Sequence, residues 1–333
     1  MGDELDTAAS TTGHTDPRAI STGKVLVTGG SGFVGRHIVR ELVARGYQPV
    51  CLVRDPDKLR ALLTPEQASR TMTVRGDLFD IESLDRASEG CVAAIHLVGI
   101  IMERRAAGQT FGRIHIEGTR NVVATCGRAG IRRYVHMSAL GARPESPARY
   151  AQTKWLAEQA VRASDLDWTI FRPSIIHGPD GDFMRMMKFF ASSRLRLPFM
   201  PYFGSGNARV QPVYVRDVAT CFVRALALPE TIGKVYALVG PERFTWKELY
   251  DVCARAITGR RRLKVPVPVA VGKLAALTVV PLMPSFVLPY KFDTGQVQMS
   301  QEDSIADPEP VEQTFGIRLR DFREELAIYA AQL

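Results

Sequence analysis

The chain has 333 residues, of which 46% are hydrophobic and 23% are charged. This length allows about two domains, and the composition excludes a wholly disordered chain, a collagen and a coiled coil. Residues 1–22 carry a net charge of −3, so that the remainder carries +11. A folded part this basic favours anionic partners: a phosphorylated cofactor, nucleic acid or an anionic membrane surface.

Residues 1–22 are rich in Ser, Thr, Asp and Ala and contain neither an apolar core nor an Arg-rich stripe. We interpret them as a disordered leader and not as a signal or transit peptide. The five cysteines and six histidines show no ligand spacing, which favours free thiols in a reducing compartment and argues against a metal centre. We expect a cytoplasmic protein, with peripheral attachment to the inner face of a membrane as an option, and not a secreted one.

From Lys24 onward, short β-branched runs alternate with helical periodicity. This pattern is typical of an α/β fold with a doubly wound parallel sheet of Rossmann type. We predict strands at 24–28, 49–53, 72–74, 93–98, 134–137 and 168–171, a helix that ends at Gly46, and helices at 81–88, 112–129 and 151–163. A dinucleotide-binding domain is predicted for 23–175, with returning segments near 207–240. Residues 176–333 would form a smaller, mostly helical lobe for substrate or docking.

A glycine-rich run follows the first predicted strand. Gly29, Gly32 and Gly35 are spaced as Gly-x-x-Gly-x-x-Gly between this strand and a helix. In a dinucleotide site the glycines allow a tight turn, close approach to a pyrophosphate and helix packing, while the helix N-terminus offers free N–H groups. We interpret the run, which includes Ser31, as a phosphate cradle, with a purely structural turn as the alternative.

The second predicted strand is followed by Arg54 instead of the acidic residue that would bind a ribose 2′-hydroxyl. An arginine there can pair with a 2′-phosphate, which favours NADP(H) over NAD(H), and a solvated arginine beside Asp55 is the alternative. Asp77, after the third strand, is a candidate for binding the adenine amino group. Helix capping is its alternative, although Asp80 fits that role better.

Tyr150 and Lys154 lie four residues apart on a predicted helix, and such positions share one face. A nearby ammonium stabilises a phenolate and lowers the pKa of the tyrosine, so that it can exchange a proton with a carbonyl or hydroxyl. Ser138, at the end of the preceding strand, could bind the same oxygen. A Tyr-x-x-x-Lys pattern alone often has only a structural role. Its place here, after the fifth strand of a dinucleotide-binding fold, favours a catalytic role for these residues.

These segments resemble the short-chain dehydrogenase/reductase superfamily, extended or atypical branch. Within it, the chain is most similar to the subgroup named for the nucleotide-binding accessory subunit of respiratory complex I (alpha subcomplex, subunit nine). The resemblance covers residues 23–260 well. The matching segments are 28–35, 76–78, 118–122, 137–139, 150–154, 172–178, 211–219 and 235–241.

The resemblance implies a set of roles along the chain. By this resemblance the pyrophosphate would be lined by Gly29, Gly32, Phe33 and Val34, and the adenine would be lined by Asp77 and Leu78. Val98 would contact one ribose, Lys154 would contact the nicotinamide ribose, and Pro173 and Ile176 would flank the nicotinamide. The catalytic tyrosine and serine of the family map to Tyr150 and Ser138. Two departures stand out. His115 occupies a position that is usually Asn, which alters the proton-relay network, and the serine-to-tyrosine gap of twelve residues makes a sugar-nucleotide substrate less favoured.

A basic and apolar stretch follows this region. Arg260, Arg261, Arg262 and Lys264 precede an apolar run in which residues 274–290 carry no charge. Because this run has fewer than the about 20 residues of a membrane span and contains three prolines, we do not expect it to cross a bilayer. Peripheral docking on anionic lipid is one interpretation, and closure of the second lobe's core with solvated arginines is the other.

We therefore expect an NADP(H)-preferring oxidoreductase that acts on a lipophilic carbonyl or alcohol, or on a quinone-related substrate. Because the closest subgroup often lacks the full catalytic set, a non-catalytic NADP(H)-binding accessory or assembly factor of a respiratory or quinone-synthesis complex is an alternative. A redox-sensing regulator is the third. Nucleic acid ranks last among the anionic partners, because no aromatic platform accompanies the basic residues.

Overall fold

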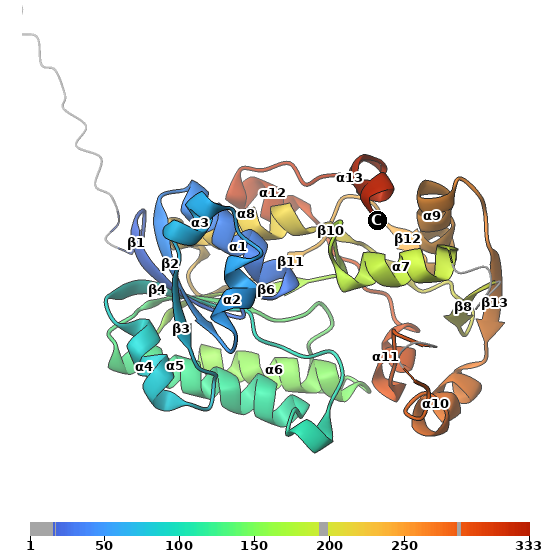
Figure 1. The fold of residues 1–333 in the computed structure, drawn as a ribbon, viewed down its shortest axis with the longest axis horizontal. Coiled ribbons are helices and arrows are strands. Elements are labelled where there is room, and N and C mark those ends of the chain that lie inside the picture. The colour runs from blue at the N-terminus through green and yellow to red at the C-terminus, as the bar shows by residue number, and fades with distance from the viewer. Residues whose placement is uncertain (1–15, 17, 193–198, 285–287) are drawn as a thin grey trace, which may run out of the picture.

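The computed structural model describes residues 16, 18–192, 199–284 and 288–333. Most of the predicted leader, residues 1–22, and residues 285–287 of the apolar run lie outside the described residues. The described chain forms one large parallel sheet with helices on both faces, followed by a C-terminal region of helices and short strand pairs (Figure 1).

Seven parallel strands make up the large sheet, in the order β11-β6-β5-β4-β1-β2-β3. This order confirms the predicted doubly wound α/β fold, because the strands run outward from β1 in both directions. The predicted strands all exist with small shifts at their ends. They are β1 (Gly23–Thr28), β2 (Tyr47–Val53), β3 (Met72–Arg75), β4 (Cys91–His96), β5 (Arg133–Met137) and β6 (Asp167–Pro173). The seventh strand, β11 (Lys234–Leu238), comes from farther along the chain, within the returning segments, and was not predicted as a strand.

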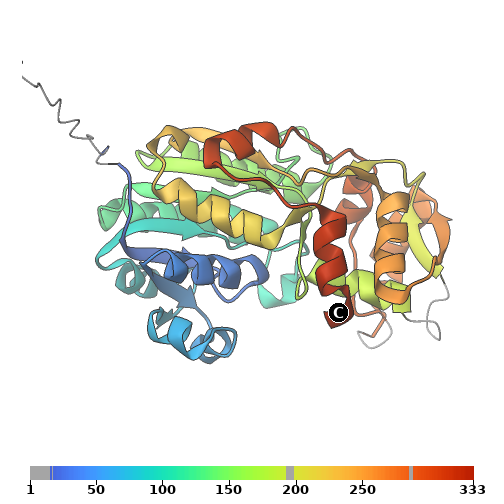
Figure 2. The same cartoon turned by 90° about the horizontal axis from the view of Figure 1, so that it is seen from above.

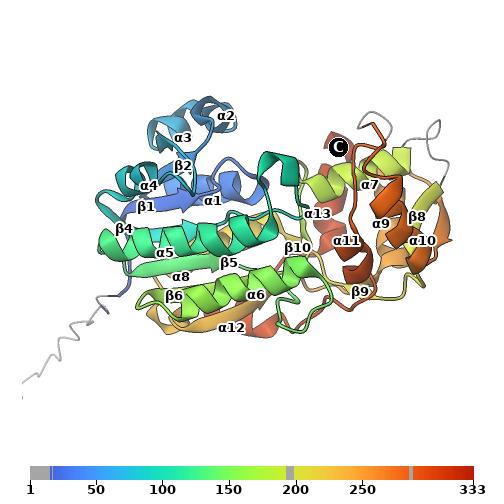
Figure 3. The same ribbon diagram turned by 90° about the horizontal axis from the view of Figure 1, so that it is seen from below.

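Side chains of each strand alternate between two hydrophobic cores, one on each face of the sheet. In β1, Val25 and Val27 join one core and Leu26 joins the other. A strand buried on both faces reads as a continuous apolar run, which is why β1 was evident from sequence. The first core is covered by α1 (Phe33–Ala44), α8 (Val215–Leu226) and α12 (Glu309–Phe315), and the second by α4 (Ile81–Ser88), α5 (Gly118–Arg128) and α6 (Arg149–Arg162), as Figures 1 and 3 show.

Three local features of the sheet half were not predicted. Two short helices, α2 (Pro56–Arg60) and α3 (Pro65–Ser69), follow β2 and are capped by Asp55 and Thr64. The predicted helix at 112–129 begins instead as a π-helical turn, η2 (Gly112–Glu117), which runs directly into α5. Single π turns recur at functional sites, because they shift the side chains that follow.

The C-terminal region mixes helices with short strand pairs, and helices make up the larger part, as predicted (Figure 2). Its helices are α7 (Asp182–Ser192), α9 (Trp246–Thr258), α10 (Val269–Thr278), α11 (Thr294–Met299) and α13 (Phe322–Tyr329). Short strands pair as β7 (Ile176–His177) with β10 (Val213–Tyr214), β8 (Phe199–Phe203) with β13 (Leu263–Val267), and β9 (Arg209–Val210) with β12 (Phe244–Thr245). Single-turn 3-10 helices of this region are η3 (Pro229–Thr231) and η4 (Ala330–Gln332), and a third, η1 (Arg105–Ala107), lies in the sheet half between β4 and η2.

Segments beyond residue 176 return to the large sheet. β11 pairs with β6, and Phe222 of α8 stacks on Phe171 of β6 with ring centroids 4.6 Å apart. The division into domains at residue 175 stays a prediction. All five cysteines are buried and free, as the sequence predicted. Within the described residues, none of the helices has the length and apolar character needed to cross a membrane.

Candidate functional site

The glycine run forms a tight turn between β1 and α1. Gly29 has φ +82°, and its carbonyl accepts a hydrogen bond from the N–H of Gly32 at 3.0 Å. A Cβ added at Gly35 would lie 2.1 Å from the Gly29 oxygen, so this position admits only glycine. Gly32 caps α1 without a side-chain hydrogen bond. The first turn of α1 therefore presents N–H groups that no capping side chain occupies, which suits an anion.

A loop from the C-terminal region touches this cradle. Cβ atoms added at Gly178 and Gly181 would lie 3.1 and 2.7 Å from the Phe33 ring. The buried Arg36 donates to the backbone oxygen of Asp180 at 3.1 Å and forms an ion pair with its carboxylate. This loop is thereby fixed against the first turn of α1, although the sequence did not indicate the contact.

Ser31 and Val34 complete the run, with Ser31 partly exposed and Val34 buried. Val98 lies directly beside the glycine turn, because a Cβ added at Gly29 would be 3.3 Å from its backbone nitrogen. The next residue, Gly99, lies close to α6, since a Cβ added at Gly99 would be 3.7 Å from the Lys154 ammonium nitrogen. Val98 and Gly99, at the carboxyl edge of the sheet, therefore lie between the glycine turn and the ammonium group of Lys154.

Residues at the far end of this edge are more exposed. Arg54 follows β2 and is solvent-exposed. Asp77 is exposed, and one oxygen of its carboxylate accepts from the N–H groups of Phe79 and Asp80 at 2.7 and 3.2 Å. Leu78 is buried, and its carbonyl accepts from the side chain of Asn121 at 2.8 Å. Asp80 caps α4 through the N–H of Ser83, as expected for it.

Lys154 is a buried residue of α6 whose ammonium group lies beside the end of β5. Its ammonium donates to the Met137 oxygen at 2.6 Å, one residue before Ser138. Burial lowers the pKa of Lys154 to about 8, and the nearby Glu158 carboxylate opposes the shift. Ser138 is also buried, and its hydroxyl has no hydrogen-bond partner among the described residues. An unpaired buried hydroxyl is costly, so this group is available to bind an oxygen of a ligand.

Tyr150 stands one helical turn before Lys154 on α6. Its ring packs edge-on against Phe111 and His115, with centroids 5.9 and 5.5 Å away. Burial raises the pKa of Tyr150 to about 12. Among the described residues, no hydrogen bond joins its hydroxyl to Ser138 or Lys154. The three predicted catalytic residues therefore share one region, but the tyrosine hydroxyl is not bonded to the other two.

His115 is buried in the π turn and connects two parts of the site. Its Nδ1 lies 2.9 Å from the Thr153 hydroxyl, and its Nε2 lies 3.1 Å from both the backbone nitrogen and the backbone oxygen of Ile100. The Thr153 hydroxyl donates to the carbonyls of Arg149 and Tyr150, each at 3.0 Å, so its oxygen is free to accept from a protonated Nδ1. Burial, followed by the Lys154 charge, lowers the pKa of His115 to about 3, so the ring is neutral.

Pro173 and Ile176 lie at the adjoining strand ends. Pro173 ends β6 and is buried, and its carbonyl accepts from the N–H of Leu140 at 2.9 Å, two residues after Ser138. Ile176 begins β7 and is partly buried. Pro173 therefore borders the segment that carries Ser138, and Ile176 pairs with Val213 of β10. The links from His115 to Thr153 and from Arg36 to Asp180 were missed by sequence reasoning, since neither pair has a local signal.

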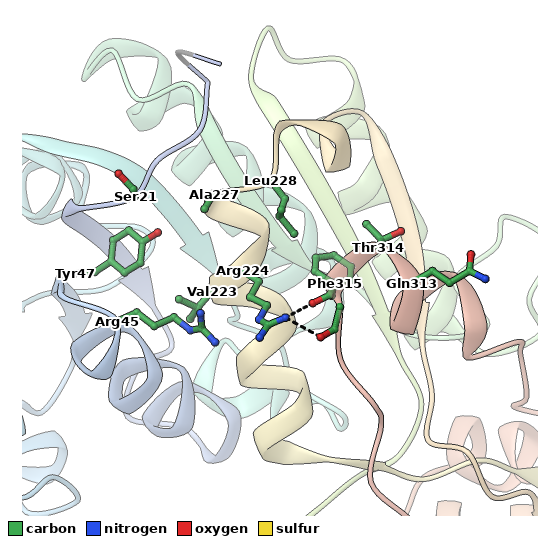
Figure 4. Close-up of a pocket in the computed structure, with 11 residues that line it drawn as sticks. Ser21, Arg45, Tyr47, Val223, Arg224, Ala227, Leu228, Gln313, Thr314 and Phe315 are labelled. Carbon is green, nitrogen blue, oxygen red and sulfur yellow. Dashed lines mark hydrogen bonds between the residues drawn. The ribbon is translucent and has the colours of Figure 1, made fainter. Parts of the chain in front are cut away.

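The predicted basic cluster is not a single free patch. Arg260 and Arg261 are exposed, whereas Lys264 forms an ion pair with Asp251 and donates to the Lys247 oxygen at 3.2 Å. A pocket of about 510 Å³ lies elsewhere, at the opposite end of the strands, where β2 begins at Tyr47 (Figure 4). In that pocket Arg45 is paired with Glu41, and Arg224 donates to the Gly316 oxygen at 3.1 Å. It does not belong to the dinucleotide edge.

Comparisons with known proteins agree with this geometry. The NAD(P)H-binding family model matches residues 29–188. A ceramide reductase from Caulobacter vibrioides is 34% identical over 248 residues, which cover 74% of this chain and 74% of that protein. The mitochondrial NADH dehydrogenase [ubiquinone] 1 alpha subcomplex subunit 9 of Dictyostelium discoideum is 30% identical over 256 residues, or 76% of this chain and 70% of that one.

The fold is also that of an NADPH-dependent quinone oxidoreductase from Escherichia coli, solved with NADPH. The TM-score is 0.70 at 19% identity, and the match covers 92% of this chain and 99% of that one. Sheet order, glycine turn and carboxyl-edge residues define an NAD(P)H-binding protein with a Rossmann-type sheet. The chain belongs to the atypical branch of the short-chain dehydrogenase/reductase superfamily, which confirms the resemblance seen in its sequence.

Proposed function

We propose that the protein is an NADP(H)-dependent reductase or dehydrogenase that acts on a lipophilic carbonyl or alcohol, quinones included. The observation that carries this proposal is the placement of Tyr150 and the buried Lys154 on one turn of α6, beside the unpaired hydroxyl of Ser138. A phenol, an ammonium and a free hydroxyl at the carboxyl edge of a dinucleotide-binding sheet are suited to proton exchange with a substrate oxygen.

The residues at this edge fit a dinucleotide. The glycine turn excludes side chains where a pyrophosphate would approach, and Arg54 is exposed where a 2′-phosphate would lie. When bound, the cofactor supplies the hydride chemistry. The remaining contacts we assign to it are Ser31, Phe33 and Val34 at the pyrophosphate, Asp77 and Leu78 at the adenine, Val98 and Lys154 at the riboses, and Pro173 and Ile176 at the nicotinamide.

The chain's own residues would handle the proton. Tyr150 donates its hydroxyl proton to the substrate oxygen, and Ser138 orients that oxygen through its hydroxyl. With a pKa of about 8, Lys154 is mostly protonated at neutral pH, so its charge is available to stabilise the phenolate one turn away. We assign His115 a positioning role, because it ties Ile100 to the turn of α6 between Tyr150 and Lys154.

The lipophilic substrate class rests on two points. The twelve-residue interval from Ser138 to Tyr150 is short for sugar-nucleotide enzymes of the superfamily, and a relative at 34% identity is a ceramide reductase. The test is NADPH oxidation by the purified protein with a series of quinones and long-chain ketones. Turnover that rises with chain length supports the proposal. No turnover with any of them, at saturating NADPH, contradicts it.

A second candidate is a non-catalytic NADP(H)-binding subunit of a larger complex. The specific observation in its favour is that Lys154 is bonded to Met137 while burial raises the pKa of Tyr150, a direction opposite to that which catalysis needs. The similarity to complex I subunits agrees with this candidate. It predicts stoichiometric cofactor retention without turnover, and co-purification with membrane proteins.

A further inference from the structure

Helix α10 packs on the protein through its small residues. Gly272 and Ala276 are buried, and Val280, just beyond the helix, continues the same face at four-residue spacing. A Cβ added at Gly272 would lie 2.8 Å from the Phe203 ring and 3.4 Å from Val297. The close approach of α10 to its neighbours therefore depends on the absence of a side chain at Gly272.

The large aliphatic residues of α10 point the other way. Leu274 is 62% exposed and Leu277 is 69% exposed, and Leu282, shortly after the helix, is 84% exposed. Val271 lies three residues before Leu274 and is exposed as well. A surface helix ordinarily buries its leucines and exposes polar residues. The outward leucines of α10 contribute little to the core, and exposed patches of this kind mark interaction sites.

The leucines lie at one end of the molecule. Figures 1 and 3 place α10 at the outer end of the C-terminal region, away from the seven-stranded sheet. The helix packs on α11 on its inner side and has ten residues, about half of what a membrane span needs. Its outer side is thus suited to lie flat on a surface.

The surroundings of this face are positively charged. Residues 260–292 contain six Lys and Arg and no Asp or Glu. The Lys273 ammonium bonds to the Gln298 side chain at 2.6 Å, and the Lys291 ammonium bonds to the Pro281 oxygen at 3.1 Å, next in sequence to Leu282. The Lys291 ammonium therefore lies near Leu282, where it can meet lipid phosphates, whereas the Lys273 ammonium is turned toward α11.

We propose that the exposed face of α10 docks on an anionic lipid bilayer, with Leu274, Leu277 and Leu282 entering the interfacial layer and Lys291 at the phosphate level. This inference moves the membrane contact from the arginine cluster to α10, and it does not depend on catalysis. A second copy of this chain is a poorer occupant, because pairing two such faces would bring like charges together.

The experiment is flotation of the full chain with vesicles of phosphatidylcholine alone and of equal parts phosphatidylcholine and phosphatidylglycerol. We expect flotation with the anionic vesicles only, reduced at high salt. The variant Leu274→Ser/Leu277→Ser/Leu282→Ser should bind at least about tenfold more weakly, because the lipid contact loses three exposed leucine side chains that would be partly buried in the bilayer. The matched control is Ile328→Ser on α13, since Ile328 is also 69% exposed, and it should float like the wild-type chain.

A second measurement keeps the test independent of the triple variant's folding. Leu277→Trp should shift its emission to shorter wavelength with anionic vesicles and be quenched by lipids brominated in the acyl chains. Three results would overturn the proposal: no flotation of the wild-type chain, equal flotation of the triple variant, or a wild-type dimer that the triple variant converts to a monomer. The last would assign the face to a second copy.

Discussion

Helices α1 and α10 differ in which side chains they bury. α1 buries Ile38 and Leu42 in the core on one face of the sheet, whereas α10 buries Gly272 and Ala276 and leaves Leu274 exposed. The apolar residues of α1 hold the glycine turn in place from within the fold. Those of α10 are free to contact something outside it. Stability and ligand binding should therefore depend on the sheet half, and surface attachment on α10.

The largest effect is expected from Tyr150→Phe in the sheet half. Loss of the phenolic proton should lower the rate of NADPH-dependent reduction by about 100- to 10,000-fold, the usual range for a proton donor. NADPH affinity and flotation with vesicles should stay unchanged, because neither uses the hydroxyl. Steady-state kinetics and equilibrium cofactor titration measure this. An unchanged rate would favour the non-catalytic candidate.

The second comparison uses leucine-to-alanine substitutions in the two helices. Leu42→Ala should lower the free energy of unfolding by about 2–5 kcal/mol, because it leaves a cavity in a packed core. Leu277→Ala should change it by less than about 0.5 kcal/mol, because that side chain is mostly in water. Urea denaturation measures both. Equal losses of unfolding free energy in the two variants would contradict the inference that α1 buries its leucines and α10 exposes them.

The third prediction concerns pH and Lys154. Its pKa of about 8 in the folded protein lies below its usual 10.5, so between these pH values the unfolded chain holds a proton that the folded chain has released. Raising the pH through this window therefore adds stability. The unfolding free energy of the wild type minus that of Lys154→Met should become more positive by up to about 3 kcal/mol from pH 8 to 10.5. A constant difference would mean that Lys154 is not desolvated.

The smallest effect is expected from Arg54→Ala. NADPH affinity should fall about tenfold, the size of one charge-assisted contact, while NADH affinity stays the same. The exposed Arg70 offers a matched control, and Arg70→Ala should bind both cofactors like the wild type. Calorimetric titration with each dinucleotide measures the ratio of NADPH affinity to NADH affinity in each protein. An equal loss for NADH and NADPH would mean that Arg54 does not read the 2′-phosphate.

Sequence patterns predicted the sheet half well because its signals are local. β1 and the glycine turn are consecutive in the chain, and α6 carries Tyr150 and Lys154 one turn apart. The two-residue strands of the C-terminal region, such as β7, are too short to show alternation. The outward leucines of α10 and the contact between His115 and Thr153 depend on tertiary packing. Sequence patterns alone therefore did not reveal them.

Mass spectrometry of the ligands released from natively purified protein tests the central claim most directly. The claim is that the carboxyl edge, from Arg54 past Gly29 to Lys154, holds a phosphorylated dinucleotide. We expect NADP⁺ or NADPH at close to one per chain, and much less in Gly35→Ala, whose Cβ would meet the Gly29 carbonyl. NAD(H) alone would contradict the preference, and no dinucleotide even after incubation with NADPH would contradict the claim itself.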